Sequence, residues 1–438
     1  MRRSKAISLG AIAAATALVA TACAGGDGGG GSTGGGGGGG GTIEIVGAFS
    51  GTQQEGFEED IAQVSEDLGI DIEYVSTNQF EVVLPSRVAG GNAPDIAIFP
   101  QPGLLKDLVA QGEIVALADA GVDVDAITSA SVPGLVDTAT VDGTVYGVPY
   151  SVNGKSLVWY PSPQFEDANY EPATSYQGLL DLTNQIKDDG TAPWCFGVDV
   201  GWLGTDWLEE FVLREGGPEV YQQWIAHEIP FNDPVIVKAA EDVAGLLLAD
   251  GNVYGGQQGI TANTFDVADD GLWTDPPSCY MHKQGNFITS FFPEDVQADL
   301  TANTNFFRLP PIEEGDPAPM LGGGDYMAMF DTENADAAAV IEAIASPDFG
   351  ANSAQTGAWL SPYVDFDKSL YANETLANVA DLIYTSEVFG FDASDQMPGQ
   401  IGNGAFWTGM VEWMGGQKDL NTVLDEIEQQ WADLEASQ

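Results

Sequence analysis

The sequence predicts a mixed α/β fold, with strands concentrated early in the chain and helices late. Short apolar or alternating runs indicate the strands. Apolar stripes at helical spacing, opened by capping residues and closed by glycine, indicate the helices. The chain has 438 residues, 44% of them hydrophobic, which suits two or three globular domains with an ample core.

The first elements form a β–α–β unit. Residues 43–46 alternate as a strand, residues 55–68 read as a helix ended by Gly69, and residues 70–75 form a second strand. Strands that alternate with helices in this way favour parallel pairing.

The next segments continue the mixed pattern. Residues 94–99 predict a short buried strand, and residues 102–110 predict a helix opened by proline. Two further strands are expected at 145–150 and 157–160, joined by a polar connection.

Helices dominate the later part of the chain. Thr174 and Gln177 have the spacing of a capping box ahead of an apolar stripe. Asp233 followed by Pro234 is a second helix start. The apolar stripe of residues 420–434 predicts a terminal helix, whose apolar face we assign to the core.

The N-terminus carries an export signal. Arg2, Arg3 and Lys5 precede an apolar run that ends before Cys23, so residues 1–22 are expected to be a signal peptide. Residues 20–23 are similar to a bacterial lipobox, which makes Cys23 the predicted lipidation site. A twin-arginine signal is an alternative, although its usual Phe-Leu pair is missing. Residues 23–41 are then a lipid-anchored, Gly-rich tether.

Charge excludes several classes of partner. The chain has 66 acidic and 13 basic residues, a formal net charge of −53. Such a surface repels nucleic acid and anionic lipid headgroups. Two histidines and three cysteines leave little for a metal enzyme, and we expect no metal and no cofactor.

No motif of an enzyme class is present, neither a nucleophile elbow nor a phosphate loop nor a zinc-binding helix. We therefore expect no catalytic residues. A secreted glycoside hydrolase stays an alternative, because it needs only two carboxylates beside one bond and the chain has acids in excess.

Polar residues beside aromatic ones recur in segments without helix or strand periodicity. Such clusters suit a sugar, whose C–H face lies on an aromatic ring and whose hydroxyls bond to carboxylates and amides. The main clusters are residues 99–102, 201–207, 276–282, 322–326, 357–362, 391–395 and 397–409.

Several of these segments make the chain resemble the solute-binding proteins of ABC sugar importers, of the maltose/maltodextrin type, and most of all alpha-glucoside-binding proteins. The segments that carry the resemblance are 93–105, 155–160, 191–197, 228–233, 277–282, 394–399 and 404–410.

The resemblance implies a two-lobed, type II periplasmic-binding-protein-like fold with a hinge and a cleft between the lobes. Lobe one would comprise 42–152 with 323–368, and lobe two 156–319 with 371–438. The cleft would bind an extracellular alpha-glucoside and the closed protein would deliver it to membrane permease subunits. We expect a monomer anchored at the outer face of the cytoplasmic membrane. A sugar sensor that signals to a membrane kinase with the same lobes is a further alternative.

The resemblance also implies a set of sugar-binding residues. In it, Asn153 replaces an acidic residue of the maltose pattern, Phe287 replaces a tryptophan, and Gly323 lies in a hinge turn. Gln54 and Glu55 are weaker candidates. The set is Phe99, Asn153, Trp202, Asp206, Trp207, Phe287, Gly324, Asp325, Trp359, Asp392, Asp395 and Trp407.

Two cysteines remain after Cys23. In an oxidising exterior Cys195 and Cys279 would pair by default, although the sequence alone does not prove it. Both lie in segments similar to the alpha-glucoside group, so the resemblance implies that they form a disulfide.

Overall fold

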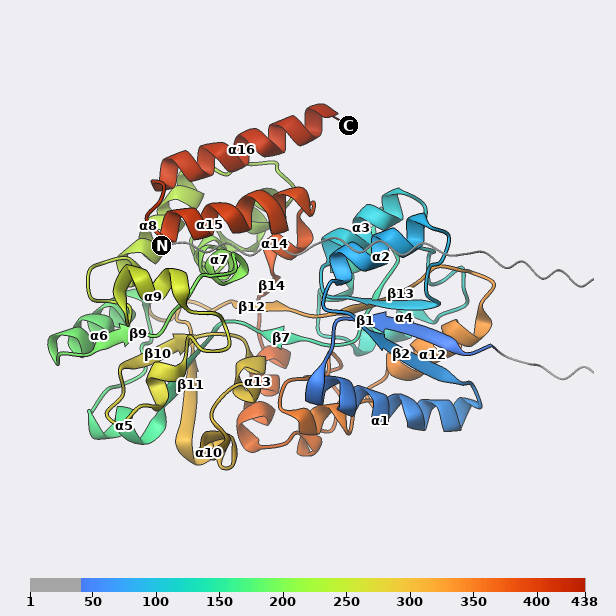
Figure 1. Ribbon diagram of the computed structural model, residues 1–438, viewed down its shortest axis with the longest axis horizontal. Coiled ribbons are helices and arrows are strands. Elements are labelled where there is room, and N and C mark those ends of the chain that lie inside the picture. The colour runs from blue at the N-terminus through green and yellow to red at the C-terminus, as the bar shows by residue number, and fades with distance from the viewer. Residues whose placement is uncertain (1–40, 438) are drawn as a thin grey trace, which may run out of the picture. The chain divides into compact units, whose positions relative to one another are not determined.

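A computed structural model of the protein describes residues 41–437 (Figure 1). The predicted signal segment, the tether up to residue 40 and Cys23 lie outside these residues. Among the helices of 41–437, none combines the length and the apolar character needed to cross a membrane.

The first half of the architecture is built on a five-stranded sheet. β1 pairs in parallel with β2 and β3, which confirms the predicted β–α–β opening, whereas β13 adds to β3 in antiparallel fashion. In order across the sheet, the strands are β2 (Ile72–Ser76), β1 (Ile43–Gly47), β3 (Ile96–Phe99), β13 (Tyr326–Met329) and β6 (Val148–Pro149). A separate hairpin joins β4 (Thr140–Val141) to β5 (Thr144–Val145).

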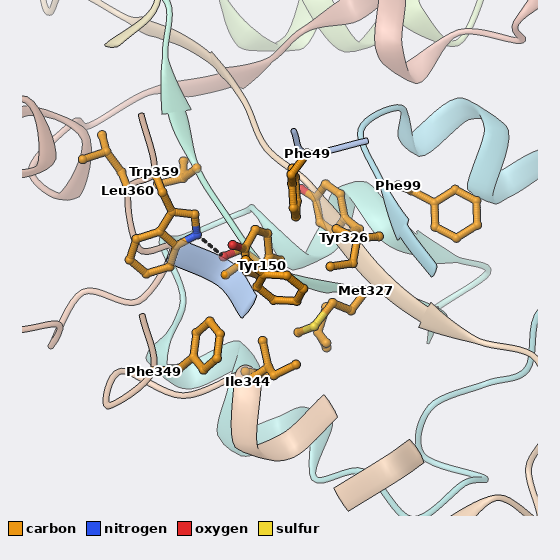
Figure 2. Close-up of a cluster of buried hydrophobic side chains, with 14 of the residues drawn as sticks. Phe49, Phe99, Tyr150, Tyr326, Met327, Ile344, Phe349, Trp359 and Leu360 are labelled. Carbon is orange, nitrogen blue, oxygen red and sulfur yellow. Dashed lines mark hydrogen bonds between the residues drawn. The ribbon is translucent and has the colours of Figure 1, made fainter. Parts of the chain in front are cut away.

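Helices pack around this sheet and bury one hydrophobic cluster, which we call the first core. Part of it is drawn in Figure 2, where Tyr150, Phe349 and Trp359 lie together and the Trp359 indole nitrogen donates to the Tyr150 carbonyl. The helices are α1 (Gly51–Leu68), α2 (Phe80–Ala89), α3 (Pro102–Ala110), α4 (Val124–Ala130), η1 (Val136–Ala139), α12 (Ala335–Ile344), η4 (Ser353–Thr356), η5 (Lys368–Leu370) and α13 (Glu374–Tyr384).

A four-stranded sheet organises a separate hydrophobic cluster, the second core. Its strands, in order across the sheet, are β11 (Thr304–Arg308), β8 (Leu157–Pro161), β10 (Cys279–Lys283) and β9 (Ala192–Trp194).

Most of the helical residues belong to this half of the chain. They are α5 (Ser162–Asp167), α6 (Tyr176–Asp188), α7 (Trp202–Ile225), α8 (Pro234–Leu247), α9 (Gly256–Ala262), η2 (Asp270–Trp273), α14 (Ala393–Gln396), η6 (Gln400–Phe406), α15 (Trp407–Met414) and α16 (Leu420–Ser437). The short helices η3 (Asn286–Ser290), α10 (Glu294–Gln297) and α11 (Leu300–Asn303) instead pack Ile288, Val296 and Leu300 into the first core.

A small three-stranded sheet lies where the chain passes between the two cores (Figure 1). β12 (Met320–Gly323) is its central strand, parallel to β14 (Phe389–Phe391) and antiparallel to β7 (Asn153–Gly154). The fold is therefore α/β with two cores and strands that cross between them. The predicted lobe boundaries stay a prediction; apolar residues of α13, such as Leu376 and Ile383, pack in the first core.

Several predicted elements are confirmed with their ends. The helix at 102–110 is α3, and the terminal stripe is α16. Asp233 caps α8 by accepting from the Val235 amide. These signals are local, so tertiary context does not overrule them.

Other expectations were wrong in detail. α1 begins at Gly51 rather than at residue 55. The cap of α6 is Ser175, which accepts from the Gly178 amide, not Thr174. The expected strand at 145–150 is broken, with β5 and β6 as short remnants.

Most of the polar–aromatic segments contain regular structure and are not loops alone; residues 400–409, for example, lie in η6 and α15. Residues 202–207 are the start of α7, and residues 279–282 belong to β10. Both elements are buried on more than one side, so they lack the alternation or stripe by which we identified regular structure.

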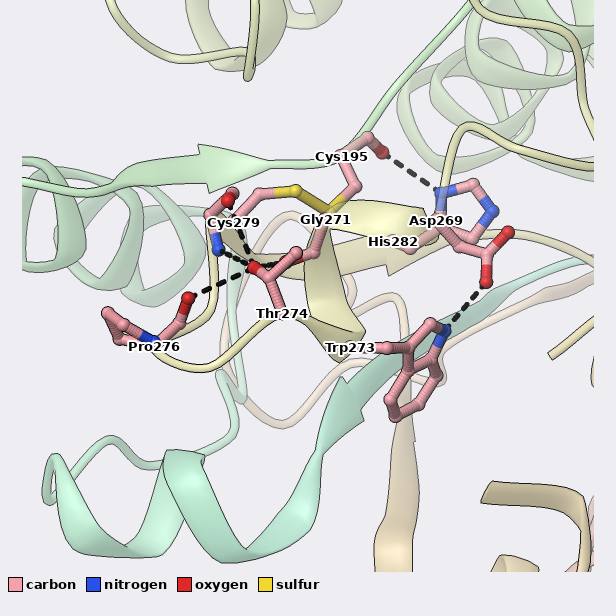
Figure 3. The surroundings of a disulfide bond; sticks show 9 residues. Cys195, Asp269, Gly271, Trp273, Thr274, Pro276, Cys279 and His282 are labelled. Carbon is pink, nitrogen blue, oxygen red and sulfur yellow. Dashed lines mark hydrogen bonds between the residues drawn. A yellow bond between two sulfur atoms is a disulfide. The ribbon is translucent and has the colours of Figure 1, made fainter. Parts of the chain in front are cut away.

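Cys195 and Cys279 form a disulfide, with their Cα atoms 5.4 Å apart, as we expected (Figure 3). The bond joins the segment after β9 to the start of β10. Both sulfurs lie in a small buried cluster with Leu272. Gly271 packs against the sulfurs, because a Cβ there would lie 2.3 Å from the Sγ of Cys279.

Asp269 is a buried acid close to this bond in the chain. One of its carboxylate oxygens accepts from the Trp273 indole, 2.8 Å away, and the other has no hydrogen-bond partner. Burial raises its pKa to about 7, against the hydrogen bond from Trp273. In the folded state Asp269 therefore binds a proton across pH 4–7, where the unfolded chain has lost it.

Stability should accordingly fall as the pH rises from about 4 to 7, by up to about 4 kcal/mol from this group. We expect Asp269→Asn, which cannot ionise, to gain melting temperature relative to the parent as the pH rises through this window. Asp270→Asn is the matched control, since it removes the same charge from an exposed neighbour. Parallel melting curves for Asp269→Asn and the parent would contradict the assignment.

Candidate functional site

Two adjoining cavities lie between the elements that bear the first core and those that bear the second. The larger cavity has a volume of about 510 Å³ and the smaller one a volume of about 250 Å³. Four residues line both cavities: Asn153, Trp202, Phe287 and Asp325. The two cavities are therefore neighbouring parts of one cleft.

The larger cavity is mainly aromatic. The connection from β1 to α1, residues 48–53, forms one wall, and Phe265, Phe287 and Phe291 line it from the other side. Trp202 and Phe287 have ring centroids 6.2 Å apart. Asp325 is the one ionisable residue among the residues that line this cavity.

The smaller cavity is polar and charged. Lys155, Asp325 and Asp395 line it together with the indole of Trp407. Gly324 also lines it, and a Cβ there would lie 2.3 Å from the Ser151 carbonyl oxygen. Only glycine fits there, so the turn between β12 and β13 brings backbone to the cavity wall.

The two cavity carboxyls differ in their preference for a proton. Burial raises the pKa of Asp325 to about 6, while the hydrogen bond from Ser151 works in the other direction. Burial and the nearby charge of Asp392 raise the pKa of Asp395 well above its usual value, although Lys155 opposes them. Asp325 is an acceptor at neutral pH, and the surroundings of Asp395 favour its protonated form, which can donate, so the cavity offers both partners that a hydroxyl group requires.

Lys155 also belongs to a buried ion cluster at the base of the smaller cavity. The Lys155 ammonium is 2.9 Å from Asp206 and 2.5 Å from Asp392. Burial lowers the pKa of Lys155, but the attraction of Asp206, Asp392 and Asp395 outweighs it and the pKa lies well above its usual value. Lys155 is therefore charged whenever the protein is folded.

The pKa values of the carboxyl groups in this cluster are shifted in opposite directions. Burial raises the pKa of Asp206 to about 7, in spite of Lys155. Burial also acts against ionisation of Asp392, but Lys155 and hydrogen bonds from its neighbours leave its pKa below the usual range. Oxygens of Asp206, Glu209 and Asp392 lie within 4.8 Å of one another. The Lys155 ammonium already pairs with Asp206 and Asp392, and we assign no metal there.

Seven of the predicted residues line the cleft, and Gly323 lines it beside them. Trp202 and Phe287 stand in both cavities, and the turn at Gly324 closes the smaller one. The seven are Asn153, Trp202, Phe287, Gly324, Asp325, Asp395 and Trp407.

Two predicted acids lie under the cleft instead of in its wall. Asp206 is 3% exposed and Asp392 is 1% exposed, and both serve the ion pairs with Lys155. Trp202 and Asp206 share a face of α7, four residues apart, so the tryptophan reaches the cavity above the acid.

Three predicted aromatics lie in the hydrophobic cores. Phe99 is fully buried and packs edge-on against Phe80, and Figure 2 shows its ring turned away from Tyr326. Trp359 packs with Tyr150 in the first core. Trp207 follows Asp206 by one residue, which turns it about 100° around α7 and into contact with Trp194 in the second core. We exclude these three from the proposed site.

Gln54 and Glu55 do not line the cleft either, whereas their neighbour Gln53 does. The extension of α1 to Gly51 accounts for the difference, because its first turn alone faces the larger cavity.

Some cleft residues were not predicted. Phe49, Phe265 and Phe291 each have polar neighbours in the sequence, but they lie outside the clusters that we singled out. Lys155 did carry a signal, since it is one of only 13 basic residues and opens an apolar strand.

Comparison with known proteins shows the family to which the chain belongs. The family model described as bacterial extracellular solute-binding protein matches residues 50–351. The osmoprotective compounds-binding protein GgtB of Synechocystis sp. is 40% identical and aligns over 89% of this chain and 92% of its own. The alpha-glucosides-binding periplasmic protein AglE of Rhizobium meliloti is 35% identical over 89% of this chain and 87% of its own.

Solved structures share the fold. The solute receptor AcbH, described as preferring β-D-galactopyranose, has a TM-score of 0.73 at 19% identity and covers 90% of this chain and 98% of its own. RafE in complex with raffinose has a TM-score of 0.69 at 18% identity and covers 89% and 98%. These likenesses establish the two-lobed α/β architecture. With the family match over most of the chain, the protein belongs to the bacterial extracellular solute-binding proteins, which bind solutes for ABC transporters rather than catalyse reactions.

Proposed function

We propose that the protein binds a small alpha-linked glucoside in the cleft and delivers it to an ABC permease. The observation that carries the proposal is the division of the cleft into a small cavity lined by three ionisable residues and a larger one lined by five aromatic residues, with four residues shared between them. A glucoside has the same division, with a hydroxyl-rich pyranose at one end and a second unit at the other.

The smaller cavity suits the glucosyl ring. Trp407 offers a face for the C–H side of the ring, while Asp325 and Asp395 offer an acceptor and a donor for its hydroxyls. Its volume of about 250 Å³ admits one hexose.

The larger cavity suits a second unit that is less strongly held. Its aromatic rings and the hydroxyl and amide groups of Ser50, Thr52 and Gln53 accept a second sugar or a small polyol. The two relatives support such a ligand, since AglE is an alpha-glucosides-binding protein and GgtB is a binding protein for osmoprotective compounds. An alpha-glucoside of glycerol would satisfy both.

Closure of the cleft would bring α3, on one side of it, against the segment that follows α14, on the other side. A Cβ on Gly103 of α3 would lie 2.4 Å from the carbonyl oxygen of Met397, which follows α14. We propose that this contact belongs to the closed form that meets the permease, and that closure couples binding to delivery.

We also propose that Cys23 carries the lipid anchor and that the chain is a monomer. A Gly-rich tether of this kind would hold the cleft near the permease and raise its effective concentration there. Mass spectrometry of the mature protein tests the lipid, and light scattering tests the monomer.

The function is tested by isothermal titration against trehalose, sucrose, maltose, palatinose and an alpha-glucoside of glycerol. Glucose and glycine betaine are the comparison ligands, one a sugar without a second unit and the other an osmoprotectant without a sugar. We expect one of the glucosides to bind far more tightly than either. Tight betaine binding with no heat from any glucoside would overturn the proposal.

Trp407 should contribute most of the stacking energy. We expect Trp407→Ala to weaken binding by about 1–3 kcal/mol with little change in melting temperature, since the indole is only partly buried. Trp207→Phe is the matched control: it should lower the melting temperature and leave the dissociation constant unchanged. The reverse pattern would move the stacking residue from Trp407 to Trp207.

Asp325 should make binding pH-dependent. Its ionised form accepts hydroxyl hydrogen bonds, and its pKa is about 6. Affinity should therefore fall as the pH drops from 7 to 5, towards a limit of tenfold per pH unit. Asp325→Asn should bind more weakly at pH 7 and lose this dependence. Asp395→Asn, which replaces a carboxyl whose surroundings favour the protonated form, should keep it; a flat profile in the parent would refute the role of Asp325.

A further inference from the structure

Two lysines are buried in the second half of the fold, each beside a tryptophan. The Lys155 ammonium lies 5.4 Å from the ring centre of Trp202, and the Lys283 ammonium lies 5.5 Å from that of Trp207. Trp202 faces the cleft and Trp207 lies in the second core. The contact between Lys155 and Trp202 therefore lies at the binding cleft, whereas the similar contact between Lys283 and Trp207 lies in the protein interior.

A hydrogen-bond chain leads from Lys155 to a second wall of the cleft. The Lys155 ammonium binds one oxygen of Asp392, and the other oxygen of Asp392 accepts from the Ser394 hydroxyl at 2.8 Å. The indole nitrogen of Trp407 donates to the same hydroxyl at 3.2 Å. Three side chains thus connect a buried charge to the orientation of an indole.

The surroundings of Ser394 leave its hydroxyl little freedom. Its amide donates to Glu209 at 3.1 Å, and the Thr205 hydroxyl lies 3.3 Å from its own. Asp392 also caps α14 by accepting from the Asp395 amide at 3.2 Å. The ion pair therefore also fixes the backbone that bears Asp395.

The path of the main chain makes Lys155 the natural start of this chain of contacts. It directly follows β7, the crossing strand that pairs with β12, and it lies two residues before β8, which begins at Leu157. Its partners Asp206 and Asp392 lie on α7 and at the start of α14. One ammonium hence joins the crossing strand to α7, which presents Trp202 to the small cavity, and to the segment that bears Ser394, the hydrogen-bond partner of Trp407.

We propose that Lys155 is a positioning residue for the ligand site: it orients Trp407 through Asp392 and Ser394, and Trp202 through direct contact with its ring. The proposal rests on the function proposed above, but its first test needs no ligand. Two of the three ammonium protons are used by Asp206 and Asp392, so Lys155 acts chiefly through these neighbours.

The first test is the indole N–H resonance of Trp407 in the ligand-free protein labelled with ¹⁵N-tryptophan, assigned with Trp407→Phe. We expect Lys155→Met and Ser394→Ala each to shift it, because both break the chain of contacts. Lys283→Met is the matched control: it removes an equally buried charge, bound to the Asp206 carbonyl and near Glu210, and should leave this resonance in place. An unchanged resonance in both cleft variants, or an equal shift in Lys283→Met, would overturn the proposal.

The second test is the dissociation constant for the tightest-binding glucoside of the titration panel. Ser394→Ala should weaken binding about fivefold, the scale of one lost hydrogen bond, and Lys155→Met about tenfold or more. The double variant should bind no more weakly than Lys155→Met alone, because both changes cut one path. Effects that multiply would show that Lys155 and Ser394 act separately and would refute the path.

The two tests also separate this inference from the proposed function. If no glucoside binds but the indole resonance responds as expected, the positioning role stands and the function fails. If a glucoside binds and the resonance does not respond, the function stands and the positioning role fails. Should Lys155→Met not fold, Ser394→Ala decides the outcome: it changes only one hydroxyl, and an unshifted Trp407 resonance in it is sufficient to reject the path.

Discussion

One buried ammonium is the constraint on which this architecture depends. Lys155 follows the crossing strand β7, and its charge is balanced by Asp206 from α7 and Asp392 beside α14. Removing Lys155 would leave its carboxylate partners uncompensated in the interior, which costs several kcal/mol. The ion pairs of Lys155 therefore matter less for the net stability that they add than for the position that they impose on the segment after β7, on α7 and on α14. The contacts of Lys155 thereby position the base of the cleft, the cap of α14, and Trp202 and Trp407 in the cleft wall.

The distribution of acids follows from the same arrangement. Of 66 acidic residues, only a few have structural work in the cleft: Asp325 and Asp395 in its wall, and Asp206 and Asp392 under it. Burial and mutual repulsion separate their affinities for a proton, so that neighbouring carboxyls act as acceptor, donor and counter-ion. Most of the other acids lie on the surface, where they make the protein strongly negative and repel anionic partners. Recognition of a neutral, hydroxyl-rich ligand thus depends on a small and partly protonated subset.

Much of the fold could be predicted from local signals. A short stretch of sequence is enough to predict the β–α–β opening, α3, the cap of α8 and the apolar stripe of α16. The start of α7 did not, because buried residues surround it and erase the amphipathic stripe. The same holds for the site: Trp202 and Trp207 look alike in the sequence, and only the helical turn between them puts one in the cleft and the other in a core. Phe99 and Trp359 were misassigned for that reason, since an aromatic next to polar residues is equally suited to packing. The role of Lys155 depends on Asp392, 237 residues later, and no local pattern can reveal such a pairing.

A crystal structure of the protein with its tightest-binding glucoside tests the central claim most directly. We expect a pyranose ring in the smaller cavity, lying on Trp407 with its hydroxyls bonded to Asp325 and Asp395. A second unit should lie among Trp202, Phe265 and Phe287. Beneath them, Lys155 should remain bound to Asp206 and Asp392. A ligand held elsewhere, for example in the groove of about 360 Å³ lined by Leu247, Ile260 and Trp413, would contradict it.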